Sequence, residues 1–143
     1  HDRPSGWFNS ATGFGALGYA APASVGAQLG APGSTVVCLT GDGGLQFSLA
    51  ELGSAKDIDA PVIFVVWNNN GYQEIETSMV DAGIKPVGVT PQAPDFVLIA
   101  KSYGIDFARP TSLGAFASAL TDALQSKAPC LIDLDEMVAE SGA

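Results

Sequence analysis

The segment from Thr40 to Tyr72, TGDGGLQFSLAELGSAKDIDAPVIFVVWNNNGY, decides the expected fold. An apolar run, Thr35–Thr40, leads into a glycine-rich turn that contains Asp42. A second apolar run, Val62–Trp67, leads into a turn that contains Asn69. Continuous rather than alternating apolarity predicts that both runs are strands buried on both faces, as in a parallel sheet. We therefore expect Asp42 and Asn69 to lie close together at the carboxyl edge of that sheet.

The residues around this segment predict alternating helices and strands. The order strand, helix, strand forms a βαβ unit with a right-handed crossover. Further expected helices lie between glycine and proline breakers. The fold class predicted is α/β, a doubly wound and mainly parallel sheet with helices on both faces. The expected helices cover 17–29, 45–57, 72–79, 96–103 and 112–126, and the remaining strands cover 105–108 and 130–134.

Several details of this assignment can be checked against the structure. Asp95 and Thr111 are expected to cap the last two helices. The last helix is expected to bury one apolar face, made of Leu113, Phe116, Ala117, Leu120 and Leu124. Residues 81–94, rich in proline and glycine, are interpreted as a loop over the surface or the site. The polar tail from Asp135 is expected to fray.

The composition indicates one globular domain over residues 1–143. Hydrophobic residues make up 47% of the chain and charged residues 15%, which excludes disorder and favours oligomerisation or docking to other domains. The net charge of −9, with no basic patch, argues against nucleic-acid binding. The chain has no apolar stretch long enough for a membrane span. Because it begins at His1 rather than Met, we interpret it as a piece of a longer protein.

Two cysteines, Cys38 and Cys130, each lie inside an apolar, strand-like run. Such residues behave as small buried hydrophobic groups more often than as disulfide partners or metal ligands. We expect two free thiols in a reducing compartment, and hence a cytoplasmic protein.

The two turns after the strands predict a cation and phosphate site. Mg²⁺ prefers six oxygens, with few protein ligands and the rest from phosphate and water. Asp42, the Asn69 side chain and the Gly71 carbonyl supply three oxygens. Gly43 and Gly44 allow the backbone to approach an anion closely. Each turn alone has a simpler explanation, because Asp is a common helix N-cap and Asn-Gly a common turn.

The pattern Gly41-Asp42-Gly43-Gly44, followed one βαβ unit later by Asn68-Asn69, resembles a known signature. Enzymes dependent on thiamine diphosphate carry Gly-Asp-Gly, a spacer of this length and Asn-Asn. The upstream glycine-rich turn and small-residue helix, over 13–27, is similar to the branch that contains acetolactate synthase and the 2-oxo-acid decarboxylases. The likeness spans about residues 7–135 and corresponds to that family's diphosphate-binding domain.

The resemblance implies a role for each matching residue. Asp42, Asn69 and the Gly71 carbonyl correspond to the Mg²⁺ ligands, and Leu17 to an apolar residue that holds thiamine in a bent conformation. The Gly15 carbonyl corresponds to the acceptor for the amino group of the pyrimidine ring. The alternative for Leu17 is an ordinary place in a helix core. The full set of implied cofactor-binding residues is Gly15, Ala16, Leu17, Gly41, Asp42, Gly43, Gly44, Asn69, Gly71 and Tyr72.

The resemblance also implies the reaction and the missing parts of the site. The reaction would be decarboxylation of a 2-oxo acid, followed by protonation to an aldehyde or addition to a second carbonyl compound. In the family, a glutamate on a separate pyrimidine-binding domain activates the cofactor, and no residue here matches it. The chain would therefore supply half of an active site, in an assembly that is at least a dimer.

A substrate is suggested by the residues after the second turn. Trp67–Tyr72 with Glu74-Ile75 resembles decarboxylases of the branch that acts on 5-guanidino-2-oxopentanoate. A carboxylate at Glu74 would suit a guanidinium group through paired hydrogen bonds, which makes Glu74, with Leu17, a candidate catalytic residue. The alternative is that Glu74 and Glu76 face solvent on a helix.

Two other functions remain open from the sequence. One is a noncatalytic module that keeps the fold, and with it cofactor binding or a structural role, without the chemistry. The other is a flavodoxin-like domain that binds a different phosphorylated ligand.

Overall fold

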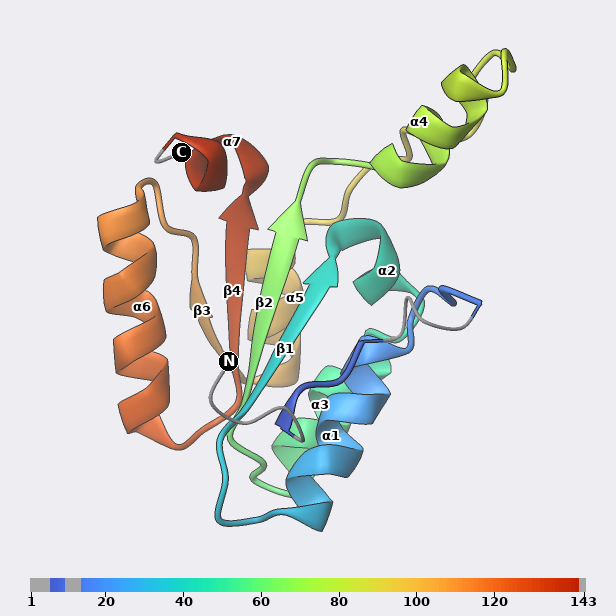
Figure 1. Ribbon diagram of the computed structural model, residues 1–143. Coiled ribbons are helices and arrows are strands. Elements are labelled where there is room, and N and C mark those ends of the chain that lie inside the picture. Colours follow the sequence, from blue (N-terminus) through green and yellow to red (C-terminus); the bar gives the residue numbers. More distant parts are fainter. Residues whose placement is uncertain (1–5, 10–13, 142–143) are drawn as a thin grey trace.

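A four-stranded parallel sheet forms the centre of the computed structural model, which describes residues 6–9 and 14–141. The strands are β1 (Val36–Gly41), β2 (Val62–Asn68), β3 (Asp106–Ala108) and β4 (Cys130–Asp135), in the spatial order β1-β2-β4-β3. Figure 1 shows their carboxyl ends together at the upper edge of the sheet. The predicted parallel sheet is confirmed. Part of the irregular N-terminal stretch, and Gly13 of the expected glycine-rich turn, lie outside the described residues.

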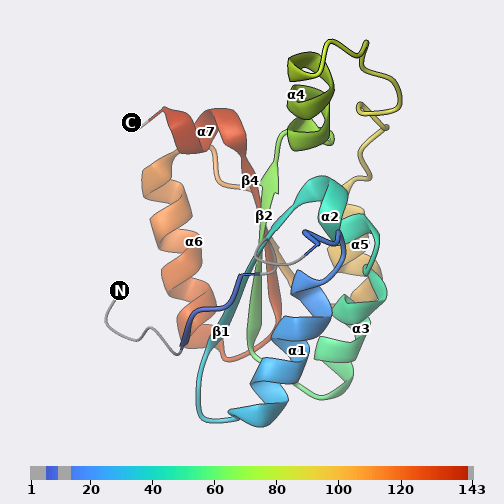
Figure 2. The ribbon, with the colours of Figure 1, turned by 45° about the vertical axis from the view of Figure 1, so that its right-hand side comes forward.

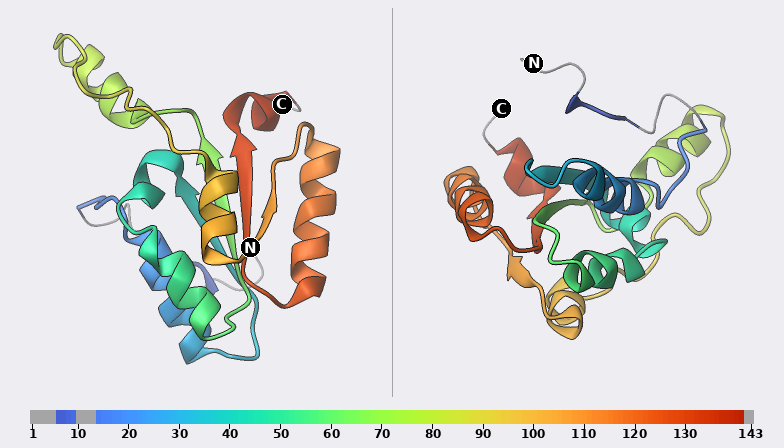
Figure 3. Two further views of the ribbon diagram at one scale, coloured as in Figure 1. Left: turned by 180° about the vertical axis from the view of Figure 1, so that it is seen from behind. Right: turned by 90° about the horizontal axis from the view of Figure 1, so that it is seen from below.

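Helices cover both faces of the sheet. Three of them lie on one face: α1 (Ala20–Gly30), α3 (Ala50–Asp57) and α5 (Phe96–Tyr103). α6 (Leu113–Ser126) lies on the other, where the short α7 (Glu136–Glu140) joins it. Figures 2 and 3 agree on this arrangement. The doubly wound α/β fold is thus confirmed.

Strand β2 carries the core on both of its faces. Val62, Phe64 and Val66 point into the cluster with α1, α3 and α5, whereas Ile63 and Val65 point into the cluster with α6. All five side chains are at most 4% exposed. The continuous apolar run that predicted a strand buried on both faces is explained by this central position.

Strand β1 does not match that prediction. Val37 is 51% exposed and Leu39 is 55% exposed, while Cys38 between them is buried. β1 is an edge strand whose neighbour is β2 alone, and α6 packs against β2 and β4. One face of β1 is therefore left uncovered among the described residues.

The two cysteines are free and buried, as predicted. Cys38 belongs to the cluster under α1 and α3, and Cys130 to the cluster under α6. They lie on opposite faces of the sheet, so they cannot form a disulfide with each other without rebuilding the core. Burial raises the pKa of both thiols, that of Cys130 to about 11.

The helix expected over 17–29 begins later, at Ala20. Gly15 and Gly18 have positive φ angles of 62° and 84°, which form turns rather than a helix. Leu17 therefore lies in a turn before α1. The helix expected over 45–57 is also interrupted: α2 (Asp42–Gln46) and α3 are separated by tight turns, in which Ser48 N–H donates to Leu45 O (2.9 Å).

The cap and buried face of α6 also differ from the prediction. The side chain of Ser112, not Thr111, accepts a hydrogen bond from the Ala115 N–H (3.1 Å). Leu113, Ala117 and Leu124 are exposed instead of buried. The residues that pack against the sheet are Phe116, Ala119, Leu120 and Ala123, one step around the helix from the expected face.

The C-terminal tail is ordered from Asp135 to Ser141, the last described residue, contrary to the prediction. β4 continues to Asp135, whose side chain then accepts from the Met137 N–H (2.8 Å) and so caps α7. The remaining predictions are close. Asp95 caps α5 through the Val97 N–H, Gly104 ends it in a left-handed conformation, and the short helix after the second turn is α4 (Gln73–Asp81).

Every helix in the described part of the chain falls short of the length and hydropathy that a membrane crossing requires.

Candidate functional site

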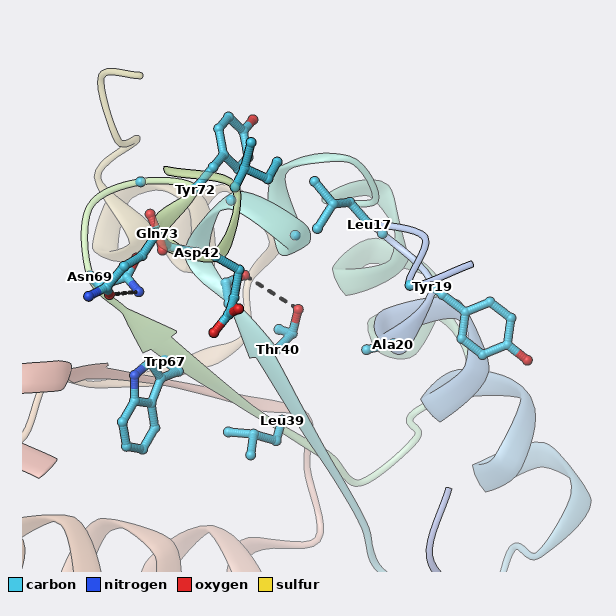
Figure 4. A pocket seen from close by; sticks show the side chains of 18 of the residues that line it. Leu17, Tyr19, Ala20, Leu39, Thr40, Asp42, Trp67, Asn69, Tyr72 and Gln73 are labelled. Atoms are coloured by element: carbon cyan, nitrogen blue, oxygen red, sulfur yellow. Dashed lines mark hydrogen bonds between the residues drawn. The ribbon is translucent and has the colours of Figure 1, made fainter. Parts of the chain in front are cut away.

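A cleft of about 550 Å³ opens at the carboxyl edge of the sheet, where the segments after β1 and β2 meet. The register explains why they meet: Gly41, the last residue of β1, pairs with Trp67, near the end of β2. All sequence-predicted site residues line this cleft (Figure 4): Gly15, Ala16, Leu17, Gly41, Asp42, Gly43, Gly44, Asn69, Gly71, Tyr72 and Glu74.

Asp42 is the most unusual of these residues. It is 1% exposed, and its Oδ2 atom has no hydrogen-bond partner among the described residues. It is the first residue of α2 rather than its N-cap, a position that Gly41 holds. Burial raises the pKa of the Asp42 carboxyl, and hydrogen bonds from the backbone around Asn69, Gly43 and Gly71 partly offset this rise. A buried carboxylate with a free oxygen requires a partner that is a cation or a proton.

The Asn69 amide lies against Asp42 and Gly71. Its nitrogen donates to Gln73 Oε1 (2.7 Å), which turns the other terminal atom of the amide towards Asp42 Oδ1 and the Gly71 carbonyl oxygen, each 3.2 Å away. With oxygen in that position, three oxygens face one another. With the amide reversed, its nitrogen would donate to both. The first orientation suits a bound cation and the second suits an empty site.

The backbone at the start of α2 is closely approached by the second turn. Gly43 is buried, and a Cβ placed on it would lie 2.5 Å from the Tyr72 ring and 3.3 Å from the Gly71 carbonyl oxygen. A Cβ on Gly71 would lie 2.8 Å from the Val89 carbonyl oxygen, which also accepts from the Tyr72 N–H (2.8 Å). Glycine is therefore required at Gly71, where the close neighbour is backbone, and a side chain at Gly43 would have to displace the Tyr72 ring.

Leu17 and Glu74 border the cleft from two different elements. Leu17, in the turn before α1, is 46% exposed, so it is not part of a helix core. A Cβ on Gly44 would lie 3.9 Å from Leu17 Cδ2, which places this side chain beside the start of α2. Glu74 is exposed on α4, a helix that projects beyond the sheet and has no buried residue (Figure 1). Glu74 therefore faces both solvent and the cleft.

Sequence reasoning missed several residues of the cleft, among them Tyr19, Trp67 and Glu136. The Trp67 Nε1–H donates to Glu136 Oε1 (2.8 Å) and links the end of β2 to α7. Trp67 could have been found as the last apolar residue before the Asn turn. Glu136 could not, because the tail that carries it was expected to fray.

The charge of the cleft is entirely negative. The described residues that line it include the carboxylates of Asp42, Glu74 and Glu136 and no Lys, Arg or His. No group of three or more His, Cys, Asp or Glu side chains suited to a metal ion occurs in the described ranges. Any metal held at Asp42 would thus depend on amide, carbonyl and ligand oxygens.

The fold and cleft define a doubly wound α/β domain with a cleft at the carboxyl edge of a parallel sheet, the place where open α/β sheets hold their ligands. Residues 1–134 match the family described as thiamine pyrophosphate enzyme, C-terminal TPP binding domain. The chain belongs to this family, as the sequence motifs predicted.

Its curated relatives include decarboxylases and acetolactate synthases. A probable 2-ketoarginine decarboxylase of Pseudomonas aeruginosa is 37% identical over 132 residues, covering 92% of this chain and 23% of the relative. The acetolactate synthase large subunit of Parasynechococcus marenigrum is 34% identical over 134 residues, covering 92% of this chain and 22% of the relative. The chain thus spans less than a quarter of the length of these relatives.

Solved structures of the same kind share the fold. The thiamine diphosphate-dependent 4-hydroxybenzoylformate decarboxylase of Rhodococcus jostii RHA1 superposes with a TM-score of 0.77 at 34% identity, covering 85% of this chain and 24% of that chain. The benzoylformate decarboxylase of Polynucleobacter necessarius superposes with a TM-score of 0.81 at 28% identity, covering 85% of this chain and 24% of that chain.

Proposed function

We propose that this chain is the diphosphate-binding part of an enzyme that uses thiamine diphosphate and Mg²⁺. The enzyme decarboxylates a 2-oxo acid or joins it to a second carbonyl compound. Two observations carry the proposal: one terminal atom of the Asn69 amide lies 3.2 Å from both Asp42 Oδ1 and the Gly71 carbonyl oxygen, and the buried Asp42 Oδ2 has no hydrogen-bond partner among the described residues. Membership of a family that binds thiamine pyrophosphate supports the identity of the ligand.

The spacing of these oxygens supports a Mg²⁺ site. Octahedral coordination with Mg–O distances of about 2.1 Å puts neighbouring ligand oxygens about 3 Å apart. The Asn69 amide atom lies 3.2 Å from Asp42 Oδ1 and 3.2 Å from the Gly71 carbonyl oxygen. Three protein oxygens leave three positions for diphosphate oxygens and water.

Charge makes the metal necessary for the proposed ligand. A diphosphate entering a cleft lined by Asp42, Glu74 and Glu136 meets carboxylates without a basic side chain among the described lining residues. A divalent cation between Asp42 and the diphosphate would convert this repulsion into attraction.

The other predicted residues would bind and orient the organic cofactor. The backbone of Gly41, Gly43 and Gly44 would approach the diphosphate, because these residues carry no side chain of their own. Leu17, with the backbone of Gly15 and Ala16, would support the thiamine end, and Tyr72 would close the cleft over Gly43. When bound, thiamine diphosphate supplies the carbanion chemistry, and the protein supplies position and electrostatics.

We further propose that residues 1–143 form one domain of a larger, multidomain enzyme in the cytoplasm. A pyrimidine-binding domain, on the same or another chain, would supply the activating glutamate, in an assembly that is at least a dimer. Such an arrangement is supported by relatives that are more than four times as long as the matched segment.

This division of the site predicts that the chain alone has negligible turnover. Release of CO₂ from a panel of 2-oxo acids should require thiamine diphosphate, Mg²⁺ and the partner that completes the site. Omitting any one of the three should reduce the rate to background. Turnover by the isolated chain would contradict the division, and a completed assembly that binds cofactor without turnover would favour a noncatalytic module.

For the substrate, we propose a 2-oxo acid with a guanidinium group, such as 5-guanidino-2-oxopentanoate (2-ketoarginine). Glu74 lines the cleft, and a probable 2-ketoarginine decarboxylase is 37% identical to this chain. A carboxylate at this place would pair with the planar guanidinium.

Exchange of Glu74 for Gln in the completed enzyme tests the substrate. We expect the preference for the cationic over a neutral 2-oxo acid, measured as the ratio of kcat/KM values, to fall about 10-fold. Glu76→Gln is a matched control, since Glu76 lies on the same helix but does not line the cleft. An unchanged ratio in Glu74→Gln would reject the role of Glu74.

A further inference from the structure

A second polar network lies behind the turn that carries Asn69, outside the cleft. It links three neighbouring strands through the side chains of Asn68, Asp133 and Arg109. Asn68 Nδ2 donates to Asp133 Oδ1 (2.8 Å). Arg109 donates to Asp133 Oδ2 from Nε (2.9 Å), and its Nη2 lies 2.8 Å from the same oxygen.

The Asp133 carboxylate is as buried as that of Asp42 but is fully partnered. It is 2% exposed in the middle of β4, and each of its oxygens has a partner on a neighbouring segment. Arg109 is held in turn by Asp95 Oδ1 (3.5 Å) and lies over the Phe107 ring, 5.5 Å from its centroid. The Arg109 side chain is 51% exposed, so this ion pair is only partly buried, and such a pair is weak evidence for stability. We therefore ask which part of the backbone this network positions.

What it places is the turn after β2. Asn68 Oδ1 accepts a hydrogen bond from the Asn70 N–H (3.1 Å), and Asn70 has a left-handed backbone with φ of 61°. Since a backbone N–H can only donate, the orientation of the Asn68 amide is fixed: its oxygen holds the turn and its nitrogen must find an acceptor. Asp133 is that acceptor.

We propose that Asp133, anchored by Arg109, is a positioning residue for the metal site. Through Asn68 it fixes the turn so that the Asn69 side chain and the Gly71 carbonyl face Asp42. This inference rests on the proposed function, since it names what holds the metal-binding turn in shape. Neither Asp133 nor Arg109 lines the cleft.

Exchange of Asp133 for Asn tests the network with little change in shape. In Asp133→Asn, the new amide at position 133 keeps its oxygen bonded to Arg109. Its NH₂ group then faces Asn68. The Asn68 amide must then reverse to accept from that NH₂, which turns its own NH₂ towards the Asn70 N–H. Two donors face each other, and the turn loses its support.

The reciprocal exchange should restore it. In Asn68→Asp/Asp133→Asn, the carboxylate at position 68 accepts both from the amide at 133 and from the Asn70 N–H. The amide oxygen at 133 still accepts from Arg109. The number of charges is unchanged, and every donor regains an acceptor.

The measurement is the affinity for Mn²⁺ in the presence of thiamine diphosphate, determined by electron paramagnetic resonance. The sample is the protein together with the segment or partner that completes the cofactor site. Thermal unfolding without metal is recorded alongside. We expect Asp133→Asn to weaken Mn²⁺ binding about 10-fold, and the double variant to recover most of that loss. Val62→Ala, at the opposite end of β2, is a control that lowers stability without touching the turn, and its Mn²⁺ affinity should stay unchanged.

The outcomes separate this inference from the proposed function. If the unaltered protein binds no Mn²⁺ with thiamine diphosphate, the proposed function fails and this inference with it. If it binds but Asp133→Asn binds equally well, the positioning role alone is wrong. Two further outcomes would also overturn the inference: Mn²⁺ binding that the double variant does not restore, and an equal loss of Mn²⁺ binding in Val62→Ala. Either would mean that the network only stabilises the fold.

Discussion

The carboxylate of Asp42 is destabilising in the metal-free protein. Burial raises its pKa above the ordinary value of 3.8, so the folded state favours the protonated form. The stability contributed by this group is fully present below the unfolded pKa and is lost as pH rises through the higher folded pKa. At neutral pH, a bound cation would compensate the buried charge. If Asp42 binds the metal as proposed, it trades the stability of the empty domain for that binding.

Removing the charge of Asp42 should have opposite effects on the stability of the metal-free protein and on the binding of thiamine diphosphate with Mg²⁺. At pH 7, we expect Asp42→Asn to raise the free energy of unfolding of the metal-free protein by about 1 kcal/mol, since a buried charge that lacks a cation is removed. The same variant should lose the stabilisation by thiamine diphosphate and Mg²⁺. Denaturant titrations with and without both ligands measure the two effects, with Asp122→Asn, exposed on α6, as control. A less stable metal-free variant would contradict the assignment of Asp42.

At the scale of single elements, helix α6 offers a test that is independent of the cofactor. Ser112 caps it, whereas the sequence analysis predicted Thr111. We expect Ser112→Ala to lower the free energy of unfolding by about 1 kcal/mol, the usual contribution of an N-cap. Thr111→Ala should change it by less than about 0.5 kcal/mol. Cofactor binding should stay unchanged in both, because neither residue lines the cleft. Equal effects of the two changes would contradict the observed cap.

The elements that could be predicted are those with local signals. β2 was recognisable because a central parallel strand is apolar on both faces, and α5 because Asp95 and Gly104 mark its ends. The exposed face of β1 could not be predicted, because an edge strand differs from a central one by its neighbours, not by its own residues. The interruption between α2 and α3, and the position of α7, likewise depend on tertiary contacts such as the Trp67–Glu136 hydrogen bond.

The candidate site was more predictable than the elements around it. Asp42 and Asn69 follow strands whose carboxyl ends must share an edge, so the pattern of one βαβ unit was enough to bring them together. Leu17 lines the cleft, as the resemblance implied, but from a turn that contains Gly15 and Gly18 instead of the expected helix. The network of Asn68, Asp133 and Arg109 was not predictable, because its members come from three strands or their ends and share no motif.

At the scale of the whole molecule, three features of the described surface agree with the proposal that this chain supplies part of a larger active site. Every charged side chain among the described lining residues of the cleft is negative, Val37 and Leu39 on one face of β1 are about half exposed, and α4 projects from the body without a buried residue. These features are explained if other domains and a second copy complete the site. The central claim concerns the part that this chain supplies.

Calorimetric titration of thiamine diphosphate tests that claim most directly. It compares the protein, together with its completing partner, in Mg²⁺ and in a chelator, and repeats the comparison with Asp42→Asn. We predict binding in Mg²⁺ that weakens at least about 100-fold in the chelator, by more than 2.7 kcal/mol, and an Asp42→Asn variant that binds equally weakly in both. Binding of equal strength with and without Mg²⁺, or unchanged in Asp42→Asn, would contradict the claim that Asp42, Asn69 and Gly71 hold the cofactor through a metal ion.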